Sequence, residues 1–142
     1  MLVLDITTEE STVLEGPECY YDQVKSIVEL QGNICVVCSD EAMNAMDIWM
    51  LEGGVWSIWC RIELGELSAE YSEETAVLEV DPTDGRLLLS TGKVIGYYDS
   101  ATRTIETIHR LVGRMRALKF ALVLCQESLI SPYIRVAMSM LL

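Results

Sequence analysis

The sequence is poor in the residues on which most catalytic and metal sites depend. It has one histidine, His109, and only ten lysines and arginines against 22 aspartates and glutamates. The resulting formal charge of −12 repels polyanions, which argues against nucleic acid or an anionic membrane as a partner. No apolar run reaches the roughly 18 residues of a membrane-spanning helix, and the N-terminus lacks the basic region of a secretory signal. We therefore expect an intracellular protein of the cytoplasm or nucleus.

The cysteines do not form a metal-binding pattern. There is no second Cys-x-x-Cys motif, and the one at Cys35 and Cys38 lies in NICVVCS, which reads as a buried strand with these side chains on opposite faces. Zinc or redox chemistry is the less favoured interpretation. An odd number of cysteines without an export signal predicts reduced, mostly buried thiols. They are Cys19, Cys35, Cys38, Cys60 and Cys125.

Three other motifs suggest chemistry only weakly. GRLLLSTGK (85–93) has six residues between Gly85 and the Gly-Lys pair where a phosphate-binding loop has four, so a hairpin is favoured. The acidic segment ELSAEYSEE (66–74) lacks the alternating Asp/Asn and the glycine of a calcium loop, so a solvated loop is favoured. His109 could act as a general base only beside a nucleophile and an orienting acid. We expect no catalytic residue, no metal and no cofactor.

The clearest pattern in the sequence is an internal repeat. Three segments each place an acid and a turn between two apolar runs: LVLDITTEESTVL (2–14), WMLEGGVWSI (49–58) and GYYDSATRTIETI (96–108). Their acids, Asp5, Glu52 and Asp99, are 47 residues apart. An aspartate at the start of a turn accepts hydrogen bonds from backbone N–H groups two or three residues on. We therefore predict a hairpin in each copy.

In the middle copy two of the three tryptophans, Trp49 and Trp56, flank the pair Gly53-Gly54. Glycines supply the positive φ of a tight hairpin turn, so the tryptophans should lie on its two arms, pair across the strands and fill a core. A second strand–turn–strand element precedes this hairpin and the next one. These elements are VELQGNICVVC (28–38), with a turn at Gly32, and LEVDPTDGRLLLS (78–90), with a turn at Gly85.

About four strands in each period of 40 to 50 residues predict an all-β fold of antiparallel, blade-like repeats of the β-propeller type. A closed propeller needs about four to eight blades, so we expect an incomplete one: part of a longer protein, a smaller open sheet, or a fold that needs a partner. Residues 1–131 should form the β-repeat domain and 132–142 a tail of uncertain structure. Within 109–129, which also reads as a helix, FALVLCQESL (120–129) is predicted as a strand. RVAMSMLL (135–142) is undecided.

Several segments, in this order, resemble the associated C-terminal domain of plant F-box proteins, which is kelch- or propeller-like. They are LDITTEESTVLEGP, VELQGNICVVCSDEAMNAMDIWMLE, VWSIWCRIEL, DPTDGRLLLSTGKVIGYYDSATRTIETI and QESLISPY. The resemblance covers nearly the whole of 1–131. It implies a module that captures the target of a cullin ubiquitin ligase, while a helical F-box docks on the ligase adaptor. Nothing in this chain looks like that F-box, so we expect adaptor binding only if an F-box lies upstream.

The expected function is a non-catalytic protein-interaction module, similar to the substrate-recognition part of an SCF-type F-box receptor, with a protein target. Its negative field would favour basic targets. The alternative is a truncated decoy or regulatory fragment that binds a target without recruiting the ligase, and an enzyme on a propeller scaffold is much less favoured.

The partner-binding residues are not identified by the sequence, but two groups are candidates. One tyrosine of each pair, Tyr20-Tyr21 and Tyr97-Tyr98, should be core, and the other could be an exposed anchor. A cluster of bases near the C-terminal third is either a solvated turn or strand edge, or a dock for an acidic partner. It comprises Arg110, Arg114, Arg116 and Lys119.

Overall fold

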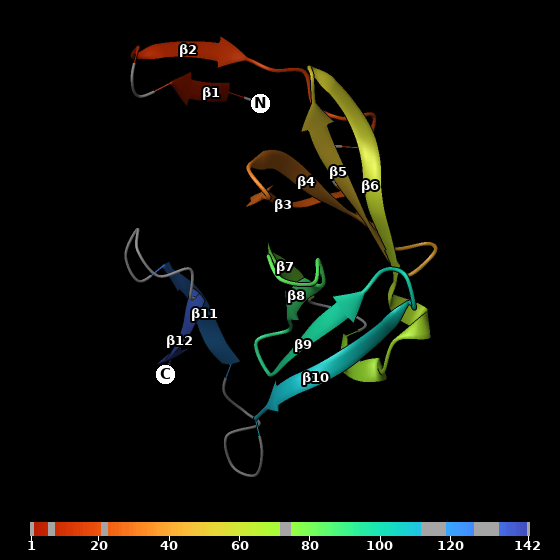
Figure 1. The fold of residues 1–142 in the computed structure, drawn as a ribbon. Helices are drawn as coiled ribbons and strands as arrows, with labels where there is room; N and C mark the ends of the chain where they lie inside the picture. The colour runs from red at the N-terminus through yellow and green to blue at the C-terminus, as the bar shows by residue number, and fades with distance from the viewer. Residues whose placement is uncertain are drawn as a thin grey trace. The chain divides into compact units, whose positions relative to one another are not determined.

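The computed structural model describes residues 2–5, 8–20, 23–71, 75–111, 119–126 and 134–141, and they are mostly β (Figure 1). Two short 3-10 turns, η2 (Leu64–Glu66) and η3 (Ala69–Tyr71), are the helical elements among these residues. The strands are β1 (Leu2–Asp5), β2 (Glu10–Val13), β3 (Val24–Leu30), β4 (Asn33–Asp40), β5 (Ala45–Glu52), β6 (Val55–Glu63), β7 (Ala76–Val80), β8 (Leu87–Ser90), β9 (Val94–Asp99), β10 (Thr104–Arg110), β11 (Lys119–Gln126) and β12 (Ile134–Leu141).

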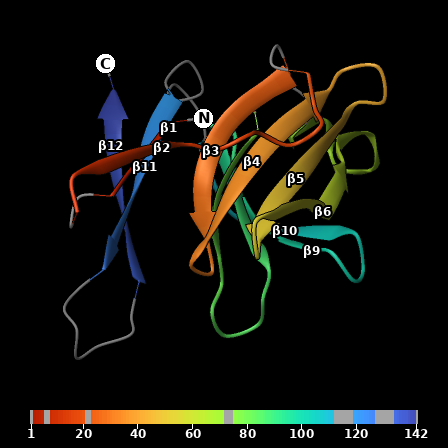
Figure 2. The ribbon, with the colours of Figure 1, turned by 90° about the horizontal axis from the view of Figure 1, so that it is seen from above.

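The chain divides into two compact units, Met1–Ile62 and Glu63–Leu142. The first contains the β1–β2 hairpin and an antiparallel sheet in the order β3-β4-β5-β6, whose strands lie side by side in Figures 1 and 2. The second contains an antiparallel sheet in the order β10-β9-β8-β7 and the β11–β12 hairpin. The all-β, antiparallel prediction is therefore confirmed, and neither sheet closes on itself. Within the described part of the chain, no helix is both long and apolar enough to cross a membrane.

The repeat seen in the sequence corresponds to a repeat of strands. Asp5, Glu52 and Asp99 are the last residues of β1, β5 and β9, and each is followed by a turn and an antiparallel partner strand. Gly32 and Gly85, with φ of 79° and 75°, lie in the turns before β4 and β8. One period of the repeat thus contains four consecutive strands, as predicted.

The hairpin of the two tryptophans is also confirmed, but the prediction that they fill a core is wrong, since the side chains of Trp49 and Trp56 are both half-buried. Gly53 and Gly54, with φ of 58° and 80°, form the turn between β5 and β6. The indole N–H of Trp56 donates to the backbone oxygen of Glu15 at 2.7 Å. The indole nitrogen of Trp49 is buried and has no hydrogen-bond partner among the described residues. One arm therefore anchors the segment before β3, and the other carries an unsatisfied donor.

The inner strands of each sheet supply most of its core. In β4 four consecutive side chains, Cys35 to Cys38, are buried, and in β8 all four residues, Leu87 to Ser90, are buried. A run without alternation is typical of a strand that is covered on both faces. The prediction of a buried strand in NICVVCS is therefore confirmed, and so is the hairpin predicted for GRLLLSTGK, since β8 pairs with β9 across the turn that follows it.

The C-terminal region is β-structured where the structure describes it. FALVLCQESL was predicted as a strand, and β11 covers its residues 120–126, while 127–129 lie outside the described residues. RVAMSMLL, which the sequence left undecided, belongs to β12, and Gln126 to Lys119 of β11 pair with Ile134 to Leu141 of β12. RVAMSMLL is therefore a strand. Its own sequence pattern does not indicate this, because the strand is defined by its pairing with β11.

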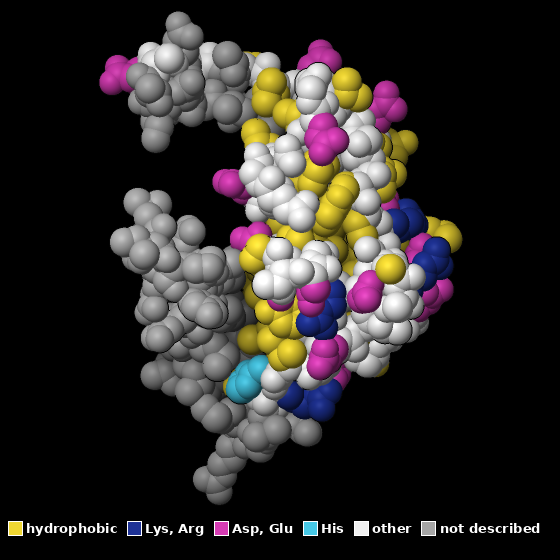
Figure 3. Space-filling view, viewed as in Figure 1, with side chains coloured by type: hydrophobic (Ala, Val, Ile, Leu, Met, Phe, Trp, Pro, Cys, Tyr) yellow, Lys and Arg dark blue, Asp and Glu magenta, His cyan; other side chains and the backbone are white. Residues whose placement is uncertain are grey.

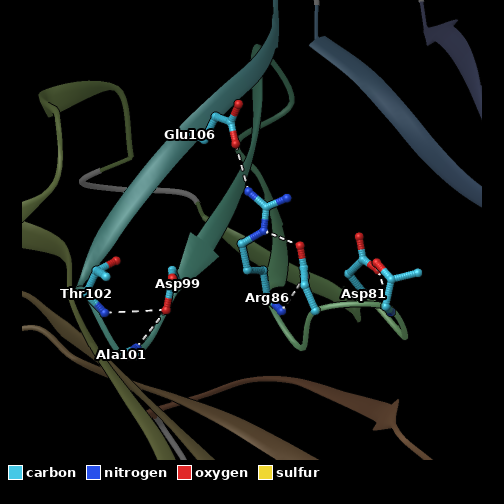
Figure 4. A network of polar contacts seen from close by, with 8 residues as sticks. Asp81, Arg86, Asp99, Ala101, Thr102 and Glu106 are labelled. Atoms are coloured by element: carbon cyan, nitrogen blue, oxygen red, sulfur yellow. Dashed lines mark hydrogen bonds and ion pairs between the residues drawn. The ribbon is translucent and has the colours of Figure 1, made fainter.

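Aspartates shape the turns of the second unit (Figure 4). Asp99 Oδ1 accepts the backbone N–H groups of Ala101 at 2.8 Å and Thr102 at 3.4 Å, as predicted for an acid at the start of a turn. Asp81 accepts the backbone N–H and the hydroxyl of Thr83, and its own backbone oxygen accepts the N–H of Gly85. These bonds fix the turns before β10 and β8.

The Asp81 turn should make stability depend on pH. Hydrogen bonds from the Thr83 hydroxyl and backbone hold the pKa of Asp81 below its ordinary value. The folded state therefore binds fewer protons than the unfolded state, so this stabilisation is complete above the unfolded pKa, about 3.9, and is lost as the pH falls through the folded value. We expect Asp81→Asn and Thr83→Ala each to flatten the fall in unfolding free energy on acidification below about pH 4. Urea unfolding at several pH values measures this, and an unchanged slope in Asp81→Asn would contradict it.

Candidate interaction surfaces

Three of the four described thiols, those of Cys35, Cys38 and Cys60, are poor nucleophiles at neutral pH. The fourth, that of Cys19, lies close to another sulfur. Burial raises the pKa of Cys38 to about 12 and that of Cys60 to about 11, and it also raises the pKa of Cys35. A thiol acts as a nucleophile or metal ligand as the thiolate, so a raised pKa disfavours both roles. Cys38 Sγ lies 2.6 Å from Cys19 Sγ, a contact between residues on β4 and on the segment before β3. No pattern in the sequence indicates this pair.

We predict that oxidised glutathione converts the thiols of Cys19 and Cys38 into an intramolecular disulfide. The two thiols lose two protons and two electrons, and one oxidised glutathione is reduced to two glutathione molecules. Because burial raises the pKa of Cys38, the reaction should be slow at neutral pH and faster at alkaline pH. Non-reducing peptide mapping should find the Cys19–Cys38 cross-link in the wild type and in Cys35→Ser. A cross-link between other cysteines, or none after prolonged alkaline oxidation, would refute the prediction.

The remaining motifs with a possible chemical role are used by the fold. In the turn of GRLLLSTGK, Ser90 Oγ accepts the N–H of Gly92, and Thr91 Oγ1 accepts those of Lys93 and Val94. These amides therefore bond the chain itself, as in an ordinary turn. Residues 66–71 of the acidic segment include η3, and 72–74 lie outside the described residues. Within the described ranges, no three His, Cys, Asp or Glu side chains come together in a way that could hold a metal ion.

His109 is a half-buried residue of β10. It lies opposite Ile95 of β9, beside an irregularity in the strand register between Thr107 and His109. The bulge re-aims the side chains that follow it. This position makes His109 part of the strand pairing of the second sheet.

The tyrosine pairs show the predicted difference in burial where they are described. Tyr98 is 2% exposed and belongs to the core, while its neighbour Tyr97 is half-buried. The guanidinium carbon of Arg86 lies 4.7 Å from the centre of the Tyr97 ring, so Tyr97 has a cation above it. Tyr20 is 77% exposed and available as an anchor, and Tyr21 lies outside the described residues.

Arg86 is itself held in place from two sides, as Figure 4 shows. Its Nε lies 2.7 Å from Asp84 Oδ2, and its Nη1 lies 2.7 Å from Glu106 Oε2 on β10. These ion pairs raise the pKa of the Arg86 guanidinium, chiefly through the hydrogen bond to Glu106. The face of Tyr97 is therefore covered by a fixed group, which makes this tyrosine a less accessible anchor than Tyr20.

The first unit exposes apolar side chains along β6. Val55 is 67% exposed, Ile58 50% and Trp59 38%. Since β6 is the last strand in the order of its sheet, one of its backbone edges has no strand partner among the described residues. Figure 3 shows apolar side chains (yellow) at the surface among acidic ones (magenta). Apolar side chains beside a free strand edge are typical of a site where another chain binds.

The far end of β6 is fixed by an arginine. Arg61 Nη1 lies 3.0 and 2.9 Å from the two carboxylate oxygens of Asp47 on β5, and Arg61 Nη2 lies 3.1 Å from Asp40 Oδ2 on β4. The hydrogen bond from Arg61 lowers the pKa of Asp40. These contacts connect β4, β5 and β6 at this end of the sheet. They therefore hold the strand that carries the exposed apolar residues in place.

Of the basic cluster, the structure describes the side chain of Arg110 alone. It lies at the end of β10, and its Nη2 is 2.7 Å from Glu70 Oε2. Arg114 and Arg116 lie outside the described residues, and Lys119 is the first residue of β11.

Comparison with known proteins adds no relative to these observations. No protein-family model, no curated protein and no solved structure matches the chain.

Proposed function

We propose that the chain is a non-catalytic protein-interaction module, similar to the part of an SCF-type F-box receptor that captures the target. The observation that carries this proposal is that the edge strand β6 exposes apolar side chains on both of its faces, Val55 and Trp59 on one and Ile58 on the other. The two four-stranded antiparallel sheets, related by the 47-residue repeat, also suit a propeller-like arrangement of blades. In this proposal an extended segment of the target pairs with β6, and its side chains pack on these apolar residues.

Affinity capture with a matched pair of variants tests the proposal. Val55→Asp combined with Ile58→Asp places two charges on the exposed part of β6, and two charges also enter the control, Met43→Asp combined with Val13→Asp, at residues that are 64% and 79% exposed. We expect a discrete set of proteins to bind the wild type and the control and to be lost with the β6 variant. Circular dichroism checks that each variant is folded. Capture of the same proteins by the β6 variant would refute the proposal.

The decoy alternative differs only in how the ligase is recruited. The residues that the structure describes include no α-helix, whereas an F-box is helical. A purified chain that binds its target but not the cullin-ligase adaptor would support the decoy form for this chain. Binding to both would support a receptor that recruits the ligase through these residues.

A further inference from the structure

The second unit has a cleft of about 400 Å³. It opens where the turn between β8 and β9 meets the end of β10 and the 3-10 turn η3. Its volume is within the range of small-ligand sites, about 300–1,000 Å³. The lining residues are Glu70, Thr91, Lys93, Val94, Arg110 and Leu111.

Hydrogen-bond donors surround this cleft. The Lys93 side chain is exposed, and its ammonium has no ion pair within the described part of the chain. Arg110 uses Nη2 to bind Glu70, which leaves further guanidinium N–H groups. The Thr91 hydroxyl oxygen accepts two backbone N–H groups, so its own proton remains available for donation. Val94 and Leu111, both buried, add an apolar wall.

Two residues that line the cleft, Lys93 and Arg110, belong to the one basic stretch of an acidic sequence. Residues 93–119 contain six of the ten lysines and arginines but two of the 22 acids, a net charge of +4. The other residues hold four bases and 20 acids, a net charge of −16. At physiological ionic strength the Debye length is about 8 Å, so distant acids are largely screened while groups inside the cleft act at contact distance. An anion is therefore favoured here in spite of the overall charge.

We propose that this cleft binds the carboxylate of an aspartate or glutamate in an acidic segment of a protein target. This rests on the proposed function, since it assigns a second contact to the same interaction module. Lys93 and Arg110 against Glu70 give the cleft a charge of +1, which matches one carboxylate. A phosphate, with nearly two negative charges at neutral pH, exceeds this charge and would leave the cleft with a net negative charge beside Glu70. Charge-assisted hydrogen bonds from Lys93 and Arg110 orient the bound carboxylate.

The test is an NMR titration of the ¹⁵N-labelled chain with three short peptides, blocked at both ends and identical except at one central residue. That residue is glutamate, glutamine or phosphoserine. We expect the glutamate peptide to shift the amides of Thr91, Lys93 and Arg110 and to bind at least tenfold tighter than the glutamine peptide. Equal binding of the two would overturn the proposal, and tighter binding of the phosphoserine peptide would overturn its assignment to a carboxylate.

Variants separate a binding role from a structural one. Lys93→Gln breaks no ion pair among the described residues and should weaken the glutamate peptide at least fivefold, whereas Lys25→Gln, an exposed lysine of β3, should leave the affinity unchanged. Glu70→Gln should strengthen binding, because it removes the acid that competes for Arg110. Weaker binding by Glu70→Gln, or equal affinities for Lys93→Gln and the wild type, would contradict the proposal. If these peptide experiments contradict the inference but the β6 variant still loses its captured proteins, only the inference fails and the proposed function stands.

Discussion

Replacement of Gly96 by alanine should destabilise the second unit by about 1 to 3 kcal/mol, the usual range for overpacking. Gly96 lies in β9 with little space above it. An added Cβ would be 2.5 Å from Tyr71 Oη, and 2.9 Å from both the backbone oxygen of Glu106 and Cγ1 of Ile105. The backbone oxygen belongs to the paired strand β10 and cannot rotate away. The buried ring of Tyr71 is also fixed, since its hydroxyl is 3.0 Å from Thr107 Oγ1.

Gly16→Ala is the matched control, because no atom lies within 4 Å of the added Cβ. Its effect should be within about 0.5 kcal/mol. All three tryptophans precede residue 63, so unfolding of the second unit is best followed by circular dichroism in urea. If Gly96→Ala unfolds at the wild-type urea concentration, the close approach of Tyr71 is not real.

The double variant with Tyr71→Phe identifies which contact causes the loss. Removal of the hydroxyl eliminates the shortest of the three contacts but leaves those with Glu106 and Ile105. Gly96→Ala should therefore lower the free energy of unfolding by about 0.5 kcal/mol less, or still less, in the Tyr71→Phe background than in the wild type. Some destabilisation should remain, because the contacts with Glu106 and Ile105 remain. Equal costs in the two backgrounds would mean that the backbone contact alone accounts for the effect.

The strands and their turns could be predicted because their signals are local. The pair Gly53-Gly54 has positive φ at both residues, and Asp99 bonds the amides just beyond it. Each of these features is determined within about four residues, where turn chemistry restricts the backbone strongly. Because the same pattern recurs after 47 residues, the sequence also predicts four consecutive strands in each repeat.

The side-chain contacts that define the candidate surfaces could not be predicted, because they join distant positions. Cys19 and Cys38 are 19 residues apart, and Arg61 and Asp40 are 21 apart. Alternation of apolar residues states which face of a strand is buried, but not which residue of another strand lies opposite. The same limit applies to Arg110, whose partner Glu70 is 40 residues away. The basic cluster was visible in the sequence, while the cleft beside it was not.

Ile48 gives the largest effect that we expect in the first unit. Its side chain is 0% exposed on β5, a strand with a neighbour on each side. Ile48→Ala removes buried methyl groups and leaves a cavity, so it should cost about 2 to 5 kcal/mol. The tryptophans Trp49, Trp56 and Trp59 all lie in this unit, so their fluorescence in urea measures its unfolding directly.

Ile58→Ala makes the same chemical change on the adjacent strand and is the appropriate comparison. Ile58 is 50% exposed, so its replacement forms no closed cavity and should cost less than about 1 kcal/mol. A large loss with Ile48→Ala and a small one with Ile58→Ala would mean that the exposed apolar residues of β6 are not needed for folding, which leaves them available for a partner. Equal large losses would instead make Ile58 part of the core, and the proposed binding surface on β6 would then have to be abandoned.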